Sequence, residues 1–228
     1  MRRPDTADLA GSVAVGAVAA FVLLALTVTG RGGSPLYGDA KLLAWSVGHR
    51  PHTVVEAARA VTFTGTGVVP YLLASLAGLL AGRTPRRRVL CLAAAVVCLA
   101  AGQSLRYGVM TLVARPRPAT RDWVTQASGW SFPSGHTTTA AITAGLLVLA
   151  IRARAPRGRT VLLMTVLTWG MLVGLTRVYL GVHWFSDVLG GWLFAVCWLG
   201  LCTWAAARLA PRGGLTGTAD PDPVSPPT

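Results

Sequence analysis

The chain has 228 residues, of which 53% are hydrophobic, and its mean hydropathy is +0.54. These values are too apolar for a soluble domain of this length and indicate an integral membrane protein. The formal net charge of +13 could suggest a nucleic-acid partner, but the arginines lie in short clusters between apolar runs, as the positive-inside rule describes. We therefore expect no nucleic-acid binding.

The first apolar run predicts a membrane span over residues 9–29. Arg2 and Arg3 precede it, and no convincing small-residue cleavage site follows, so a retained span is expected rather than a signal peptide. A Gly- and Pro-containing breaker at 30–35 ends the run. Residues 37–62 mix charged and apolar side chains, which favours one or two interfacial helices on the membrane surface.

Later apolar runs predict five more spans, separated by polar or arginine-rich segments. They cover residues 63–81, 89–113, 137–151, 161–180 and 184–207. The expected fold is therefore all-α, with six transmembrane helices forming one membrane domain over 1–214. The polar, proline-containing tail at 215–228 is expected to be disordered.

Arginine-rich loops at 82–88 and 152–159 predict the topology. They should be cytoplasmic together with both termini, which places a multi-pass protein in the plasma membrane. The ends of spans three and five and the starts of spans four and six then meet on the extracytoplasmic face. Arg106 lies in the third span, where a charge is costly unless it faces a polar cavity.

Three groups suited to phosphate chemistry stand near the junction of the last two spans. His183 and Asp187 are four residues apart, so a helix beginning near Trp184 would let the carboxylate reach the imidazole. This pair predicts a base or nucleophile with its orienting carboxylate. Arg177 adds a permanently charged, planar group suited to oxyanions.

Two more polar segments precede the fourth span. In residues 114–118, alternating prolines fix an extended track that carries Arg115 and Arg117. Residues 133–136 read Pro-Ser-Gly-His at a helix start, where free amide groups and the helix dipole favour an anion. Ser134 is the expected cap, Gly135 allows close approach of the backbone, and His136 projects from the first turn.

These motifs resemble the type 2 phosphatidic acid phosphatase family, the membrane relatives of vanadium haloperoxidases. Pro-Ser-Gly-His at 133–136 is intact, and the family's Ser-Arg, five residues, His, three residues, Asp is matched with Thr176 in place of serine. In the family's lysine, six residues, Arg-Pro motif, Arg117 and Pro118 match, but the lysine position holds Met110. The resemblance covers 106–191.

The resemblance implies a phosphohistidine on His183, oriented by Asp187, with His136 as general acid and base. Arg117, Arg177, Ser134 and Gly135 would bind the phosphate, with a further contribution from Arg115. No metal and no cofactor are implied. Because a thioether carries no charge, we expect Arg106, one helical turn before Met110, to take over part of the lysine's role.

The expected activity is hydrolysis of a lipid phosphate monoester or diphosphate. The candidate substrates, which the sequence does not separate, are undecaprenyl diphosphate, phosphatidate and phosphatidylglycerol phosphate. Met110 leaves open a catalytically weakened relative that acts as a lipid-binding or scaffold protein. An anion channel is less consistent with the sequence, because the charged residues cluster at one end of the spans rather than along a path. Six spans also suit a lipid better than the halide chemistry of a haloperoxidase.

Overall fold

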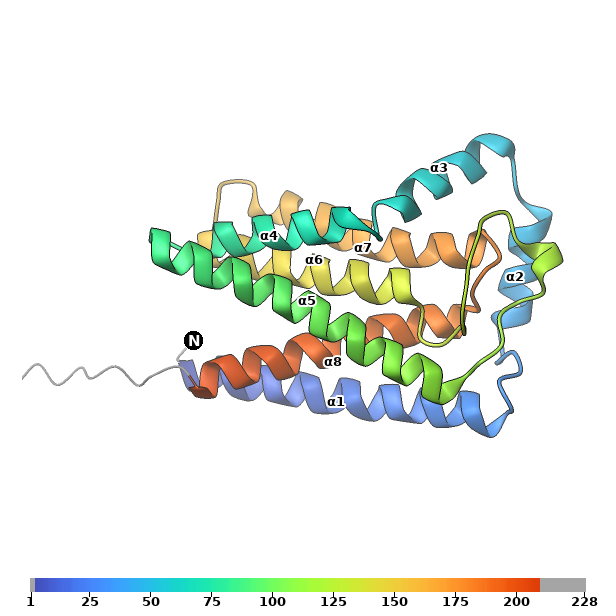
Figure 1. Cartoon of the computed structure of the whole chain (residues 1–228), viewed down its shortest axis with the longest axis horizontal. Helices are drawn as coiled ribbons and strands as arrows, with labels where there is room; N and C mark the ends of the chain where they lie inside the picture. The colour runs from blue at the N-terminus through green and yellow to red at the C-terminus, as the bar shows by residue number, and fades with distance from the viewer. Residues whose placement is uncertain (1–2, 210–228) are drawn as a thin grey trace, which may run out of the picture.

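The computed structural model describes residues 3–209, which are almost entirely helical (Figure 1). The tail predicted to be disordered lies outside these residues. The elements are α1 (Arg3–Gly30), α2 (Asp39–Gly48), α3 (His52–Phe63), α4 (Val68–Ala81), α5 (Pro85–Val113), the 3-10 turn η1 (Thr120–Asp122), α6 (Gly135–Arg154), α7 (Arg159–Tyr179) and α8 (Phe185–Leu209). The predicted all-α class is confirmed.

Five helices, α1, α5, α6, α7 and α8, are long and apolar enough to cross a membrane. α3 and α4 meet the same criteria only as a pair, and they are bent by 52° at a short break, as in a broken span or a re-entrant segment. A continuous span from residue 63 was therefore wrong, since α4 begins at Val68 and its 14 residues are too few to cross alone. Six spans result when the bent pair counts as one.

Glycines explain the break between α3 and α4. Gly67 adopts a left-handed conformation (φ 63°), which ends helical geometry there. Gly65 packs so closely on α7 that a Cβ atom would lie 2.3 Å from Cγ1 of Val173. The chain therefore turns between the two helices while remaining in contact with α7.

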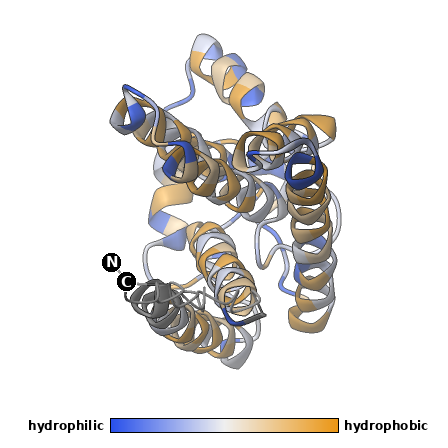
Figure 2. Cartoon of the chain, turned by 90° about the vertical axis from the view of Figure 1, so that its left-hand side faces the viewer, coloured by the Kyte–Doolittle hydropathy of each residue, from blue (hydrophilic) through white to orange (hydrophobic). Residues whose placement is uncertain are grey.

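The membrane helices pack around α6, whose apolar window is 56% buried, the largest share among the candidate spans. α6 contacts α4, α5, α7 and α8, while α1 packs along α8. A core of Ala74, Leu99, Ile142 and Ala195 joins α4, α5, α6 and α8. Figure 2, viewed along the bundle, shows hydrophobic residues along the helices and hydrophilic residues at their ends. This packing fixes the end of α6, where the Pro-Ser-Gly-His motif lies.

The two arginine-rich loops lie together at one end of the bundle, on the left in Figure 1. Arg83 donates to the carbonyl of Ala153, and Arg154 donates to the carbonyls of Leu80 and Gly82. The opposite end carries α2, α3, the segment from 114 to 134 and the turn between α7 and α8. The one or two helices predicted within residues 37–62 are present as α2 and α3, and their position at the membrane surface stays a prediction.

Candidate active site

A polar cavity of about 470 Å³ opens at the end of the bundle opposite the arginine-rich loops. Its walls come from α5, α6, α7, the segment from 126 to 129 and the turn before α8. It is lined by Thr66, Gln103, Arg106, Tyr107, Met110, Arg117, Gln126, Ala127, Ser128, Gly129, Gly135, His136, Thr139, Arg177 and His183. Six of the residues predicted for the site thus share one cavity: Arg106, Arg117, Gly135, His136, Arg177 and His183.

The turn between α7 and α8 places His183 at the cavity. Gly181 has φ 81° and packs so closely on η1 that a Cβ atom would lie 2.1 Å from the carbonyl oxygen of Asp122. Arg50 links the same parts, donating to the carbonyls of Tyr179 (3.0 Å) and Asp122 (2.7 Å). The turn is therefore held from two sides, and His183 is only 2% exposed.

Asp187, in the first turn of α8, orients the imidazole of His183. Its Oδ2 lies 3.4 Å from Nδ1 of His183 and accepts hydrogen bonds from Ser131 Oγ and the Trp184 amide (2.9 Å). Both side chains are buried. The predicted spacing of four residues brings the pair together, although α8 starts at Phe185, after the histidine.

Arg117 contacts the other nitrogen of the ring. Its NH1 lies 2.9 Å from Nε2 of His183, and because a guanidinium only donates, Nε2 accepts and Nδ1 carries the proton that faces Asp187. Burial lowers the pKa of His183 to about 4; the hydrogen bond to Asp187 opposes this shift, and the charge of Arg117 adds to it. The ring is thus neutral at pH 7, with its unprotonated nitrogen at the cavity.

Carbonyl groups hold the rest of the Arg117 guanidinium. Nε donates to Gly129 (2.9 Å), NH2 to Ser128 (2.8 Å) and Trp130 (3.0 Å), and NH1 also to Val182 (2.8 Å). Burial lowers the pKa of Arg117, with Asp187 acting in the opposite direction. The arginine therefore fixes the loop over the cavity as well as contacting the histidine.

Arg177, at the end of α7, is 2% exposed and lines the cavity. Its NH1 donates to Thr62 Oγ1 on α3 (3.2 Å), whereas its Nε has no hydrogen-bond partner among the described residues. An under-satisfied buried cation is costly in an empty site. An anion in the cavity would supply the missing negative charge.

Arg106 reaches from α5 across the position of the missing lysine. Its NH1 donates to Sδ of Met110 (3.1 Å), and a Cβ atom at Gly135 would lie 3.4 Å from Arg106 Cζ. The guanidinium thus lies against the first residue of α6, beside His136 in the cavity wall. The expectation that Arg106 supplies charge where Met110 has none stays a prediction.

Ser134 and Arg115 do not line the cavity. Ser134 is fully buried, and although it is the N-cap residue of α6, its hydroxyl accepts from Thr137 Oγ1 (2.9 Å) rather than from a backbone amide. Arg115 is also fully buried and donates to two carboxylates, a hydroxyl and two carbonyls behind the cavity. This corrects the expectation that Arg115 binds phosphate, because each of its N–H directions already has a protein acceptor.

Three side chains that support the site were not predicted from sequence. Ser131 donates to Asp187, Thr62 accepts from Arg177, and Asp39 contacts Arg115 (2.9 Å). Ser131 could have been suspected from sequence, because it lies two residues before the Pro-Ser-Gly-His motif. Nothing in the sequence marked Thr62 or Asp39. The described residues contain no group of three or more His, Cys, Asp or Glu side chains that could hold a metal ion.

The sequence model of the PAP2 superfamily matches residues 40–210, three quarters of the chain and all of the cavity. This chain belongs to the PAP2 superfamily. The resemblance predicted from sequence is therefore confirmed.

Curated PAP2 relatives include phosphatidylglycerophosphatase B of Escherichia coli K12, 37% identical over 93 residues, which are 41% of this chain and 35% of that protein. Phosphatidylglycerophosphatase B of Bacillus subtilis is 37% identical over 67 residues, 28% of this chain and 33% of that one. The matched regions thus span about a third of these relatives' length.

A solved structure extends the likeness to the whole fold. The crystal structure of a transmembrane PAP2-type phosphatidylglycerolphosphate phosphatase from Bacillus subtilis superposes with a TM-score of 0.70 at 22% identity, over 87% of this chain and 98% of that chain. The PAP2 helical membrane fold is therefore shared along nearly the entire structure.

Proposed function

We propose that this PAP2 protein is a membrane lipid phosphatase that hydrolyses a phosphate monoester or diphosphate through a phosphohistidine, without a metal ion. The observation that carries the proposal is the contact between Arg117 and Nε2 of His183 in a cavity that also contains His136, Arg106 and Arg177. An unprotonated histidine nitrogen beside several guanidinium groups suits attack on a phosphate.

In the first step, Nε2 of His183 attacks phosphorus while the bond from phosphorus to the leaving oxygen breaks. Asp187 stabilises the positive charge that develops on the ring by facing the Nδ1 proton. His136 takes up a proton as the anionic substrate enters the cavity among the guanidinium groups, and it gives this proton to the leaving oxygen. Arg106, Arg117 and Arg177 stabilise the equatorial oxygens, and NH1 of Arg117 turns from the nitrogen to the substrate.

In the second step, water attacks the phosphorus of the phosphohistidine. His136, now neutral, removes a proton from that water, and the nitrogen–phosphorus bond breaks to restore His183 and release phosphate. The reaction needs no redox partner. Phosphoryl transfer depends mainly on positioning and charge stabilisation, which three guanidinium groups supply here in place of a divalent cation.

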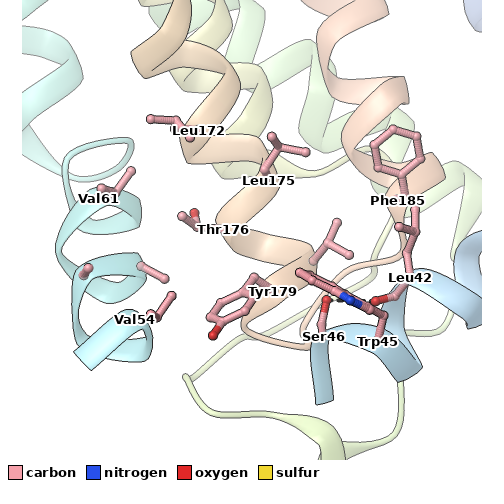
Figure 3. A pocket seen from close by; sticks show the side chains of 13 residues that line it. Leu42, Trp45, Ser46, Val54, Val61, Leu172, Leu175, Thr176, Tyr179 and Phe185 are labelled. Carbon is pink, nitrogen blue, oxygen red and sulfur yellow. Dashed lines mark hydrogen bonds between the residues drawn. The ribbon is translucent and has the colours of Figure 1, made fainter. Parts of the chain in front are cut away.

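An apolar groove supports a lipid as the substrate. The groove, about 410 Å³, lies between α2, α3 and α7 and is lined by side chains that include Trp45, Val61, Leu175 and Tyr179 (Figure 3). Thr176 borders the groove and precedes Arg177, so hydrocarbon there would lie close to the phosphate-binding arginine. Phosphatidylglycerol phosphate is the first substrate to test, because the similar relatives are phosphatidylglycerophosphatases by name.

We also propose that the cavity faces the outside of the plasma membrane, with both termini in the cytoplasm. The support is the arginine-rich end of the bundle, which the positive-inside rule assigns to the cytoplasm and which lies opposite the cavity. Cysteines introduced singly at Arg86 and Arg121 would test this with a membrane-impermeant thiol reagent in intact cells. Labelling at position 86 but not at position 121 would show the opposite orientation, with the cavity facing the cytoplasm.

The test of activity is phosphate release by purified protein in detergent with a chelator present. The panel contains phosphatidylglycerol phosphate, phosphatidate and undecaprenyl diphosphate. His183→Ala should abolish release, whereas His52→Ala should not, because that imidazole is 89% exposed on α3 and away from the cavity. No release from any of the lipids, or equal release by His183→Ala, would refute the proposal.

A scaffold role is the second candidate, and Met110 at the family's lysine position is the one observation that favours it. It predicts that the wild type binds the lipid phosphate but turns it over no faster than His183→Ala. Lipid binding and phosphate release measured on the same preparation separate the two functions.

A further inference from the structure

Asp39 lies at the start of α2, far in sequence from the catalytic motifs, and is only 2% exposed. Its carboxylate accepts four hydrogen bonds. The donors are the Leu36 amide (2.9 Å), the Ser186 amide (2.9 Å), the Ser186 hydroxyl (2.6 Å) and NH2 of Arg115 (2.9 Å). A carboxylate that accepts four hydrogen bonds and is buried this deeply is held in one position.

Arg115 connects this carboxylate to the catalytic pair. Its NH1 donates to Oδ1 of Asp187 (2.6 Å), while its NH2 donates to Asp39. The other oxygen of Asp187 faces Nδ1 of His183. Asp39, Arg115, Asp187 and His183 therefore form one continuous buried chain of charged and polar groups, and Arg115 divides its charge between two carboxylates.

Charges in this chain are poorly screened, because Arg115 and Asp187 are fully buried. Two carboxylates and one guanidinium leave one net negative charge beside the imidazole. Without the charge of Asp39, Arg115 would pair with Asp187 alone and cancel it. The ring of His183 must gain positive charge as it bonds to phosphorus, so this cancellation would oppose the reaction.

We propose that Asp39 is a positioning residue for the nucleophile, which acts through Arg115 to keep the negative charge of Asp187 available to His183. The inference rests on the proposed function, in which His183 attacks phosphorus. Other charged or titratable groups around the ring are Arg117 on the loop, Arg177 on α7, His136 on α6 and Arg106 on α5. None of these four residues is substituted in the test variants.

The test is a charge cycle in the purified full-length protein, read as the pH dependence of kcat/KM on the lipid that the wild type hydrolyses fastest. Asp39→Asn removes a negative charge at constant size, so the acid limb should move to lower pH by about half a unit or more, and kcat should fall at least tenfold. Arg115→Gln removes the positive charge, so its limb should move to higher pH. The double variant restores the net charge, and its limb should return toward the wild-type position.

Ser186→Ala is the matched control, because it removes hydrogen bonds to Asp39 and Arg115 but no charge. Its acid limb should coincide with that of the wild type. If Asp39 had only a structural role, the acid limbs of Asp39→Asn and Arg115→Gln would not move in opposite directions. This result would overturn the inference. If Asp39→Asn alone does not fold, the acid limb of Arg115→Gln is compared with that of the double variant. Limbs at different pH support the inference, and limbs at the same pH overturn it. A wild type that releases no phosphate would instead refute the proposed function itself.

Discussion

Arg117 donates a hydrogen bond to Nε2 of His183, the nitrogen that the proposed reaction needs free. The remaining N–H groups of this arginine bind carbonyls of Val182 and of residues 128–130. One side chain thus holds the loop, contacts the proposed nucleophile and, in the proposed reaction, supplies charge for the phosphate. Binding of substrate must exchange the bond to Nε2 for a bond to a phosphate oxygen.

Arg117→Lys should lower kcat/KM at least a hundredfold, although the charge remains. An ammonium group cannot reproduce the planar set of donors that binds four carbonyls and the imidazole. The variant should also melt at a lower temperature in detergent, because the four carbonyls that hold the loop lose their guanidinium donor. Arg121→Lys, on the exposed surface of η1, should change neither quantity. Arg117→Lys with activity within threefold of wild type would exclude the role assigned to this arginine.

The pH dependence follows from His183. Its pKa of about 4 lies below the ordinary value of 6.5, so the folded state favours the neutral ring. At pH 5 about nine tenths of the rings would be neutral, against about 3% for an unshifted histidine. Activity per enzyme should therefore stay high down to about pH 5 and fall near pH 4, after correction for titration of the substrate phosphate.

The same shift affects stability. Between about pH 6.5 and 4 the unfolded chain binds a proton at this histidine that the folded chain does not, so this contribution to stability is lost as the pH falls through that window. Arg117→Ala removes a charge that lowers the pKa, and its acid limb should lie at higher pH than that of the wild type. An acid limb near pH 6.5 in the wild type would contradict the burial of the ring.

Arg106 and Met110 allow a rescue experiment. Arg106→Ala should reduce kcat/KM on the order of a hundredfold, because the cavity loses a cation beside His136. Adding Met110→Lys to that variant restores a cation at the family's usual position and should recover at least tenfold. The recovery of kcat/KM supports the replacement only if the double variant melts at the same temperature as Arg106→Ala. An Arg106→Ala variant as active as the wild type would show that Arg106 does not replace the lysine.

The groove between α3 and α7 predicts a dependence on hydrocarbon length. Ala57→Trp places an indole in the groove from an exposed position, so KM should rise several-fold for a long-chain lipid phosphate. A short-chain analogue, which does not reach the groove, should be hydrolysed as before. Ala60→Trp, exposed on the same helix but outside the groove, is the control. Equal effects on both chain lengths would mean that hydrocarbon does not occupy this groove.

Periodic and local features of the chain could be predicted from sequence. Apolar runs of about twenty residues predicted the long spans, and the spacing of His183 and Asp187 predicted their contact, although His183 itself precedes α8. The break at Gly65 and Gly67 was missed, because the apolar run continues through it and hydropathy does not register backbone conformation. Packing against α7, a tertiary feature, decides where the helix ends.

The role of Arg115 could not be predicted for a related reason. In sequence it stands two residues from Arg117, on the same extended track, and the two guanidinium groups look equivalent. Alternation along an extended chain directs neighbours differently, and the packing of α2 and α8 shows that Arg115 faces the carboxylates of Asp39 and Asp187. A buried ion pair between distant segments leaves no periodic trace in the sequence.

The break between α3 and α4 connects the membrane to the phosphate site. The helix interruption leaves polar backbone groups within an apolar region, and part of them are satisfied locally: the Gly65 amide donates to the Thr62 carbonyl, and the Thr64 amide donates to the Val61 carbonyl. Because Gly65 has no side chain, its backbone packs directly on Val173, and α3 lies close enough to α7 for Thr62 to accept a hydrogen bond from Arg177. The bend between α3 and α4 therefore sets where Thr62 holds the guanidinium of Arg177, so a break far from the sequence motifs takes part in shaping the wall of the cavity.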